Sequence, residues 1–407
     1  MNEPRNQPPA SSRSTKNARA KVDPEYIKTF VKNVFGGDMH ALRVLSLSNG
    51  VIGVVHAAAL AIHAIGQAYA RVAGIEPRSG VKQVDRMLSN SGFDLRVVLK
   101  PWVQFVVGVR KEIVIAIDWT DFEKDDHTTL CAYLVTRHGR ATPLAWKTVK
   151  KSTLKGTRNQ SEYELVEWLH GALDEDVEIV LLADRGFGDQ KLYELLQTLG
   201  WDFVIRFRGG ISVQNAAGET RAADAWVPAN GRATMLRNVQ VTDDQAKLPA
   251  VVVARARKMK EAWCLATTLS KRTAAQVVKL YGKRFSIEET FRDEKNLHFG
   301  MGLSATHIRD GARRDRLLLL AAIAHALLTL LGAASEEVGL DRYLKVNTVK
   351  RRTHSLYRQG LYWYDCIPTM RKDWLRPLMA AFDRIVREQA IFREIFGVSD
   401  TFSGRTA

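Results

Sequence analysis

Cysteine is scarce in this chain. Its 407 residues contain three cysteines, Cys131, Cys264 and Cys366, which lie far apart in the sequence. No Cys-x-x-Cys pair and no histidine pair at metal-ligand spacing accompanies them, so neither a disulfide framework nor a zinc site is expected. This pattern favours a protein that folds in a reducing compartment, and we expect a cytoplasmic one.

An apolar leader segment is also missing. Residues 1–21 are polar and basic, which argues against a secretory signal peptide. The longest apolar run, residues 317–334, reaches only the lower limit for a membrane span and contains His325 and Thr329. We therefore expect this run to form a helix buried in the protein core, with no membrane as partner.

Acidic residues are the minority charge. The chain has 60 lysines and arginines against 44 aspartates and glutamates, a formal net charge of +16. Such a surplus favours a polyanionic partner, because cations that neutralise phosphates release condensed counterions. Nucleic acid is the expected partner. The alternative is that the net charge serves only to keep the protein soluble.

Hydrophobic periodicity divides the chain into regions of different character. Helical spacing dominates both ends, and short apolar runs typical of strands fill the middle. The expected order is a disordered basic tail (1–24), a helical N-terminal domain (25–105), an α/β core (106–208), a β-rich insertion (209–268), the second part of the core (269–335) and a helical C-terminal region (336–407). The N-terminal helices could bind DNA or simply cap the core.

Two aspartates each follow a short apolar run that is typical of a β-strand. Asp118 ends the run that starts at Glu112, and Asp184 ends the run that starts at Val177. Sites in α/β sheets form at the carboxyl ends of strands, so both carboxylates could point at one place. Two divalent ions held by such oxygens can stabilise a phosphoryl transfer. The plainer alternative is that each aspartate caps the turn after its strand.

The turn after the second strand reads Asp184-Arg-Gly-Phe-Gly188. A dinucleotide-binding loop would need a third glycine where the chain has Lys191, so the G-x-G-x-x-G pattern fails. We expect the glycines to form a tight turn beside the acid instead.

Four polar residues share one stripe of a predicted helix. Tyr281, Arg284, Glu288 and Lys295 recur at helical spacing and combine a carboxylate with a hydroxyl and two cations. Such a stripe could grip phosphates around a metal ligand. A solvated helix with ion pairs one turn apart is the alternative.

These four residues reproduce the Y-x2-R-x3-E-x6-K signature, and the chain resembles DDE transposases of the insertion-sequence-4 type, bacterial cut-and-paste enzymes. The resemblance covers roughly residues 110–300. It implies an α/β fold with an RNase H-like catalytic core, a β-rich insertion and flanking helical regions. It also implies that Asp118, Asp184 and Glu288 are the catalytic triad and bind two Mg²⁺ ions, which Mn²⁺ could replace.

The resemblance also implies contacts with DNA. Tyr281, Arg284 and Lys295 would hold phosphates near the cleaved transposon end, and Arg206 stands where the family has a DNA-contacting arginine. Trp263 resembles a family tryptophan that stacks on a flipped base. It lies a few residues closer to the tyrosine than the family pattern has it, and a core tryptophan on a strand is the alternative.

The implied function is that of a transposase. Such an enzyme binds the terminal inverted repeats of an insertion sequence, cleaves the DNA through a hairpin and joins the ends to target DNA. The C-terminal helical region would pair two protomers in a DNA-bound homodimer. Two alternatives stay open, namely an RNase H-like endonuclease that does not join strands and a catalytically silent DNA-binding regulator.

Overall fold

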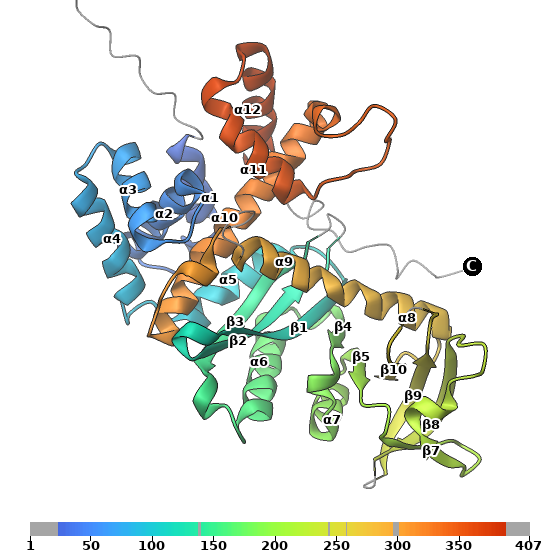
Figure 1. Ribbon diagram of the computed structural model, residues 1–407. Coiled ribbons are helices and arrows are strands. Elements are labelled where there is room, and N and C mark those ends of the chain that lie inside the picture. Colours follow the sequence, from blue (N-terminus) through green and yellow to red (C-terminus); the bar gives the residue numbers. More distant parts are fainter. Residues whose placement is uncertain (1–22, 137–139, 243–244, 258, 296–300, 388–407) are drawn as a thin grey trace, which may run out of the picture.

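The computed structural model describes residues 23–136, 140–242, 245–257, 259–295 and 301–387 (Figure 1). The predicted basic tail falls almost wholly outside these ranges, as does the end of the predicted C-terminal region, residues 388–407.

Helices alone fill the N-terminal part that the structure describes, as the sequence predicts. They are α1 (Pro24–Phe35), α2 (Ala41–Ala57), α3 (Ile62–Ala73), α4 (Pro77–Ser89) and α5 (Leu95–Val107). Asp23 caps α1 by accepting a hydrogen bond from the Glu25 amide. A Cβ on Gly66 of α3 would lie 2.4 Å from Val81 Cα of α4, so these two helices pack backbone to backbone.

A ten-stranded sheet forms the centre of the molecule, in the order β3-β2-β1-β4-β5-β10-β9-β8-β6-β7. The strands are β1 (Glu112–Phe122), β2 (His127–Leu134), β3 (Thr142–Lys150), β4 (Glu178–Ala183), β5 (Asp202–Phe207), β6 (Ser212–Gln214), β7 (Thr220–Ala222), β8 (Thr234–Val241), β9 (Ala246–Ala254) and β10 (Trp263–Thr267). The predicted antiparallel meander of β1, β2 and β3 is confirmed, and β4 and β5 run parallel to β1.

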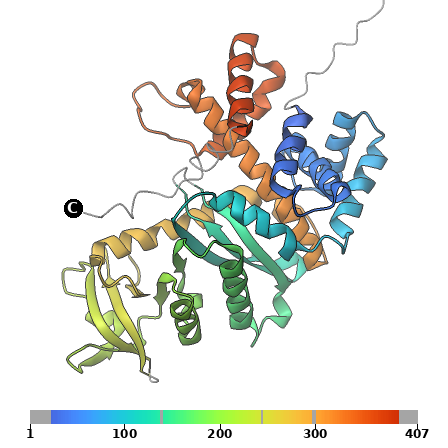
Figure 2. The ribbon, with the colours of Figure 1, turned by 180° about the vertical axis from the view of Figure 1, so that it is seen from behind.

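The β-rich segment predicted for residues 209–268 does not form a sheet of its own. Its last strand, β10, pairs antiparallel with β5, so β10, β9, β8, β6 and β7 extend the core sheet. These strands lie at the end of the molecule opposite the N-terminal helices (Figure 2). The insertion and the core therefore share one hydrogen-bonded ladder.

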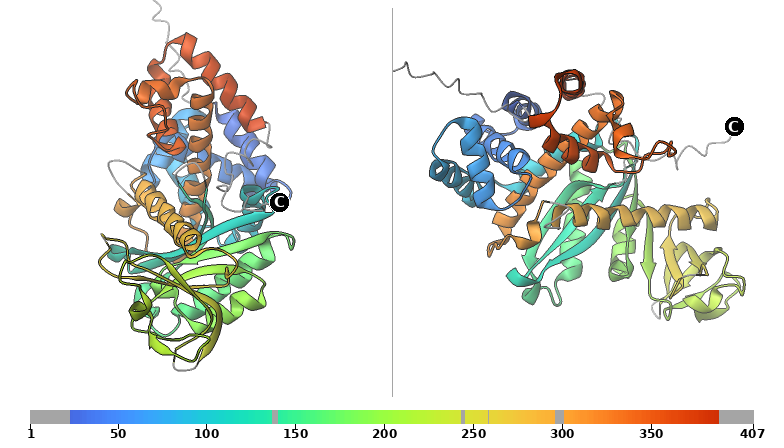
Figure 3. Two further views of the ribbon diagram at one scale, coloured as in Figure 1. Left: turned by 90° about the vertical axis from the view of Figure 1, so that its right-hand side faces the viewer. Right: turned by 45° about the horizontal axis from the view of Figure 1, so that its top comes forward.

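Helices cover both faces of the sheet. On one face lie α6 (Arg158–Ala172) and α7 (Gln190–Thr198). On the other, α8 (Ala274–Gly282) and α9 (Ser286–Lys295) follow each other from the insertion to the core, as Figure 3 shows. This arrangement confirms the expected fold class, an α/β core with a β-rich insertion and flanking helical regions.

The predicted buried apolar helix is confirmed as α10 (Gly311–Glu337). Its length and composition would suit a membrane span, but 94% of its apolar window is buried inside the protein. The C-terminal helices α11 (Leu356–Cys366) and α12 (Lys372–Arg387) pack against it. A Cβ on Gly360 of α11 would lie 1.8 Å from Leu328 O of α10, so glycine allows this close contact. Helix α10 thus joins both helical ends to the core.

Candidate active site

Asp118 and Asp184 lie side by side where the parallel pairing of β1 and β4 ends. The parallel ladder of β1 and β4 ends with the pair Ile117 and Ala183, and each aspartate is the next residue. Their positions follow from the strand register, which is set by two fully buried apolar runs.

The sequence pattern suggested that strand β1 ends at Asp118, but the strand is longer. It continues to Phe122, because residues after Asp118 keep their pairing with β2 as far as His127. What ends at this point is the pairing with β4, so Asp118 stands where the two strands part. Its carboxylate accepts a hydrogen bond from the Trp119 amide at 2.9 Å.

Asp184 begins the glycine turn that the sequence predicts. Its Oδ1 accepts a hydrogen bond from the Gly186 amide at 2.8 Å and caps a short 3-10 helix over residues 185–187. A Cβ on Gly188 would lie 3.2 Å from Phe207 Cβ of β5, so the turn packs closely on the next strand. The capping alternative is thus true of Asp184 and compatible with a role as a ligand.

Glu288 is linked to Asp118 through an arginine. Arg284 donates from Nη1 to Asp118 Oδ2 at 3.1 Å and from Nη2 to Glu288 Oε1 at 2.7 Å. The single helix expected for the signature is wrong in detail, because a 3-10 turn over residues 283–285 separates α8 from α9. The turn carries Arg284 between the two carboxylates.

The electrostatics of the site follow from this convergence. The pKa of Asp118 is raised to about 6, mainly by burial and also by the negative charges of Asp184 and Glu288, while Arg284 opposes the shift. Burial also raises the pKa of Tyr281, so its hydroxyl stays neutral. The site is therefore a concentration of negative charge that one buried guanidinium partly neutralises.

The donor chemistry of the site fits a hard divalent cation, which prefers carboxylate oxygens. As they lie, however, no three acidic, histidine or cysteine side chains in the described part of the chain stand at metal-ligand spacing. Arg284 lies between Asp118 and Glu288 and supplies the positive charge there. Ligation by all three acids would require Arg284 to release at least one of its ion pairs.

Lys295 lies at the end of α9 and faces the end of β1. Its Nζ donates to the Asp121 carbonyl at 2.7 Å and lies 4.4 Å from the centre of the Phe122 ring. Asp118, Glu288 and Lys295 line one open hollow of about 450 Å³. Part of the signature therefore faces a space that can hold a ligand.

Trp263 lies at the start of β10, half-buried, and its ring makes a T-shaped contact with the Tyr281 ring at 4.8 Å between centroids. The ring of Phe285, which is 43% exposed, lies 6.1 Å away. Arg206, on β5, forms an ion pair with Glu261 at 2.9 Å. The structure thus groups Trp263 with the signature tyrosine and places Arg206 at the border of the insertion.

Sequence reasoning missed Glu162 of α6, which is fully buried. Its Oε1 accepts hydrogen bonds from Trp119 Nε1 at 2.7 Å and from Arg158 Nε at 3.2 Å. A Cβ on Gly186 would lie 3.2 Å from Arg158 Nη2, so this network ties the segment after Asp118 to the turn after Asp184. The available signal was an acid on the apolar stripe of a helix.

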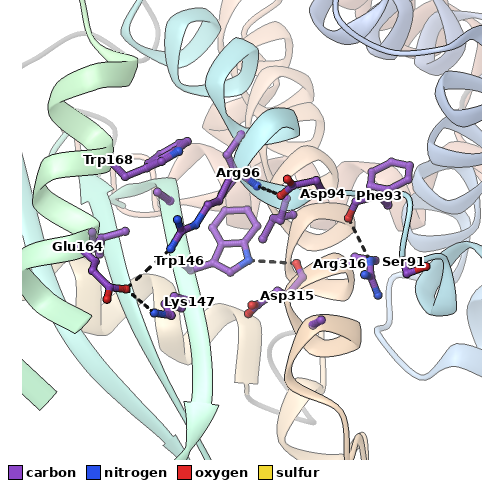
Figure 4. Close-up of a pocket in the computed structure, with 15 residues that line it drawn as sticks. Ser91, Phe93, Asp94, Arg96, Trp146, Lys147, Glu164, Trp168, Asp315 and Arg316 are labelled. Atoms are coloured by element: carbon purple, nitrogen blue, oxygen red, sulfur yellow. Dashed lines mark hydrogen bonds and ion pairs between the residues drawn. The ribbon is translucent and has the colours of Figure 1, made fainter. Parts of the chain in front are cut away.

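A second cavity, of about 380 Å³, lies where α5, α6 and α10 meet β3 (Figure 4). Glu164 pairs there with Lys147 at 2.7 Å and with Arg96 at 3.8 Å, and Trp146 donates to the Asp315 carbonyl. These polar groups bind one another, so we assign the cavity to packing.

Comparison with known proteins agrees with this geometry. A family model described as a transposase DDE domain matches residues 109–327, which is more than half of the chain. The match begins just before β1 and ends within α10, so it includes the three acids, the insertion and the signature residues. A search of curated protein sequences found no match.

This family acts on DNA and typically uses divalent metal ions. The mixed sheet with flanking helices agrees with its RNase H-like fold. On the length of the match and the architecture around the strand-end acids, the chain belongs to the family of DDE transposases.

Proposed function

We propose that this protein binds the terminal inverted repeats of an insertion sequence, cleaves the DNA there and joins the freed ends to target DNA. Asp118, Asp184 and Glu288 are the proposed ligands of two Mg²⁺ ions, for which Mn²⁺ can substitute. The observation that carries the proposal is the convergence of these acids, two through the parallel register and the third through Arg284.

The chain's own groups have distinct tasks in this reaction. The two aspartates, on neighbouring strands, fix the position of the scissile phosphodiester, and Glu288 completes the ligand set. Bound divalent ions would lower the pKa of the attacking water and offset the charge that develops around phosphorus. Arg284, once released from the carboxylates, is free to pair with a phosphate.

The remaining signature residues hold the DNA end. Tyr281 keeps its proton and is 1% exposed in the free protein, so it would donate to a phosphate oxygen only once the DNA end uncovers it. Lys295 adds a point charge beside the hollow. Trp263 offers a half-buried ring for stacking on a flipped base. Arg206 contacts the backbone from the insertion side.

A single site suffices for the complete sequence of steps. Cleavage, hairpin formation, hairpin opening and strand transfer are each an in-line displacement at phosphorus, with water or a DNA 3′-OH as nucleophile. Two DNA ends have to be held together, so we assign the C-terminal helices to pairing of protomers and the N-terminal helices to DNA binding. The reaction takes place on DNA in the cytoplasm.

The test uses DNA from the borders of the gene, where inverted repeats bounded by a short direct repeat are expected. Wild-type protein with Mg²⁺ should cut at the repeat and join a 3′-OH end to a second DNA. Asp184→Ala should abolish cleavage and leave binding to the end measurable. Cleavage without joining would favour an endonuclease, and binding without cleavage in either metal would favour a regulator.

A further inference from the structure

A basic groove lies beside the catalytic edge of the sheet, between the end of β5 and the insertion. Its volume is about 950 Å³. The charged residues that line it are Arg185, Arg206, Arg208, Arg255, Arg257 and Lys260, together with Asp224 and Glu261. Six cations against two carboxylates leave the groove positive, so it favours an anionic ligand.

One carboxylate in this groove holds two of its arginines. A single oxygen of Glu261, Oε2, accepts from Arg185 Nη1 at 3.0 Å and from Arg206 Nη2 at 2.9 Å. Two guanidinium groups that converge on one oxygen make the arrangement that binds phosphate well. Glu261 therefore stands where an external anion would be held.

This contact is easy to exchange. The side chains of Glu261 and Arg185 are 61% and 54% exposed, and exposed ion pairs contribute little to stability. Arg206 is more enclosed, with 21% exposure, and its buried Nε has no hydrogen-bond partner among the residues that the structure describes. The Arg206 guanidinium is thus incompletely satisfied by Glu261, and an anion with more oxygens could replace the carboxylate at small cost.

The position of the groove identifies the anion. Arg185 directly follows Asp184, and Arg206 lies on β5, the strand next to β4. An anion held between them is continuous with the acids where we place the DNA backbone. Further cations line the groove on the insertion side, as a strand with one charge per nucleotide requires.

We propose that the groove binds the DNA backbone that leads away from the cleaved phosphodiester, and that Glu261 is a built-in substitute for one of its phosphates. The inference rests on the proposed function, since it takes the groove's anion to be the DNA substrate. In the free protein Glu261 occupies the clamp of Arg185 and Arg206. A DNA strand has to displace Glu261 to enter. This displacement costs binding free energy, so a backbone that makes no other contact with the protein binds weakly.

The experiment compares Glu261→Gln with Glu219→Gln. Both variants remove one exposed negative charge from the insertion, but Glu219 pairs with Arg221, which does not line the groove. The probes are a short fluorescein-labelled single strand and its duplex, titrated in EDTA so that nothing is cut. Glu261→Gln should bind about threefold to fivefold more tightly than Glu219→Gln, in line with the strength of an exposed ion pair.

Three further measurements fix the cause. The Glu261→Gln change should steepen the fall of log affinity with log salt by up to about 0.7 for the single strand, because no displaced carboxylate then offsets the neutralisation of one phosphate. Adding Arg206→Ala to Glu261→Gln should remove the gain. Thermal unfolding should be the same for all variants with an intact Arg206, because the ion pair is exposed.

Equal affinity of Glu261→Gln and Glu219→Gln, or weaker binding by Glu261→Gln, would overturn the inference. Cleavage of end DNA with Mg²⁺, measured on the same preparations, separates this from the proposed function. If the wild type binds and cuts while the two variants are alike, only the inference fails. If the wild type binds and never cuts, the proposed function fails.

Discussion

The core half of the sheet (β3, β2, β1, β4 and β5) and the insertion half (β10, β9, β8, β6 and β7) differ in how far their charged side chains are buried. In the core half, β2 is buried along its whole length, and the Arg284–Asp118 pair at its edge is enclosed, with side chains 7% and 18% exposed. In the insertion half, β7 is largely exposed, most of β8 is half-buried or exposed, and Glu261 is largely exposed. The core half thus fixes a few charges in position, whereas the insertion half offers many charges that can exchange partners.

The difference follows from the free energy of desolvation. A buried charge is costly unless it is paired in good geometry, so Asp118 keeps its pair with Arg284 until another cation replaces it. An exposed charge costs little and gains little, so the arginines of the groove can move from a carboxylate to a phosphate. Chemistry needs the first property, and capture of a long polyanion needs the second.

The sharpest test of this contrast is Asp118→Asn. Loss of this carboxylate in the core half should lower cleavage by about 1000-fold or more, because Asp118 is one of the three proposed metal ligands. DNA affinity in EDTA should stay close to that of the wild type. Asp121→Asn, on the same strand but paired with Lys151, is the control and should cut normally. Normal cleavage by Asp118→Asn would remove it from the catalytic site.

Glu162→Gln should have the next largest effect. The amide can still accept from Trp119 but loses the ion pair with Arg158, so the two aspartate segments are less firmly tied. We expect the Mn²⁺ concentration for half-maximal cleavage to rise about 10-fold to 100-fold, as for other residues that orient metal ligands. Glu164→Gln, on the same helix, should leave the Mn²⁺ concentration for half-maximal cleavage unchanged. A fall in cleavage with no change in Mn²⁺ dependence would contradict this positioning role.

Trp263→Ala tests the border between the halves. Loss of a stacking surface should weaken binding of a pre-cut DNA end about tenfold, whereas Trp263→Phe should retain most of the affinity. Trp226→Ala is the matched control, since Trp226 also lies in the insertion but donates to the Val213 carbonyl. Equal losses for Trp263→Ala and Trp226→Ala in DNA binding would point to a structural role only.

The last prediction concerns stability and pH, and not cleavage or DNA binding. Burial raises the pKa of Glu294 to about 8, while the unfolded chain would titrate near about 4.3. Between these values the folded state binds more protons, so the free energy of unfolding falls as pH rises, by at most about 1.4 kcal/mol per unit.

Glu294→Gln keeps a partner for the Tyr133 hydroxyl and removes this titration. The melting temperature of Glu294→Gln, relative to that of the wild type, should therefore increase as pH rises from about 5 to about 8. Glu289→Gln, more exposed on the same helix, should show no such trend. A constant difference between Glu294→Gln and the wild type across this range would show that Glu294 is not buried as a neutral acid.

Much of the core could be predicted from local patterns. The apolar runs before Asp118 and Asp184 specify buried strands, and such strands in an α/β sheet bring their ends together. The long apolar run of α10 was likewise a reliable sign of a buried helix. The spacing of the signature residues indicated a DDE transposase of the insertion-sequence-4 type, and the match over residues 109–327 confirms the DDE transposase family.

The rest depends on pairing between distant segments. Nothing near Asp118 indicates that β1 continues along β2, and nothing near Arg284 indicates a 3-10 turn that carries it to Asp118. The same holds for the groove, since Arg185 and Glu261 meet only because β10 returns to β5. Local spacing indicated which residues are candidates for the active site, whereas the pairing of distant segments determines which of these side chains contact one another.

The ladder between β5 and β10 has a mechanical consequence. Because the insertion shares backbone hydrogen bonds with the core, it cannot swing toward the acids on a hinge, as a separately folded lobe could. A nucleic acid that contacts both halves has to fit this fixed surface, so any bending or unpairing that the fit requires occurs in the nucleic acid. The energy of distortion then falls on the DNA, and sequences whose base steps deform easily would be the better substrates.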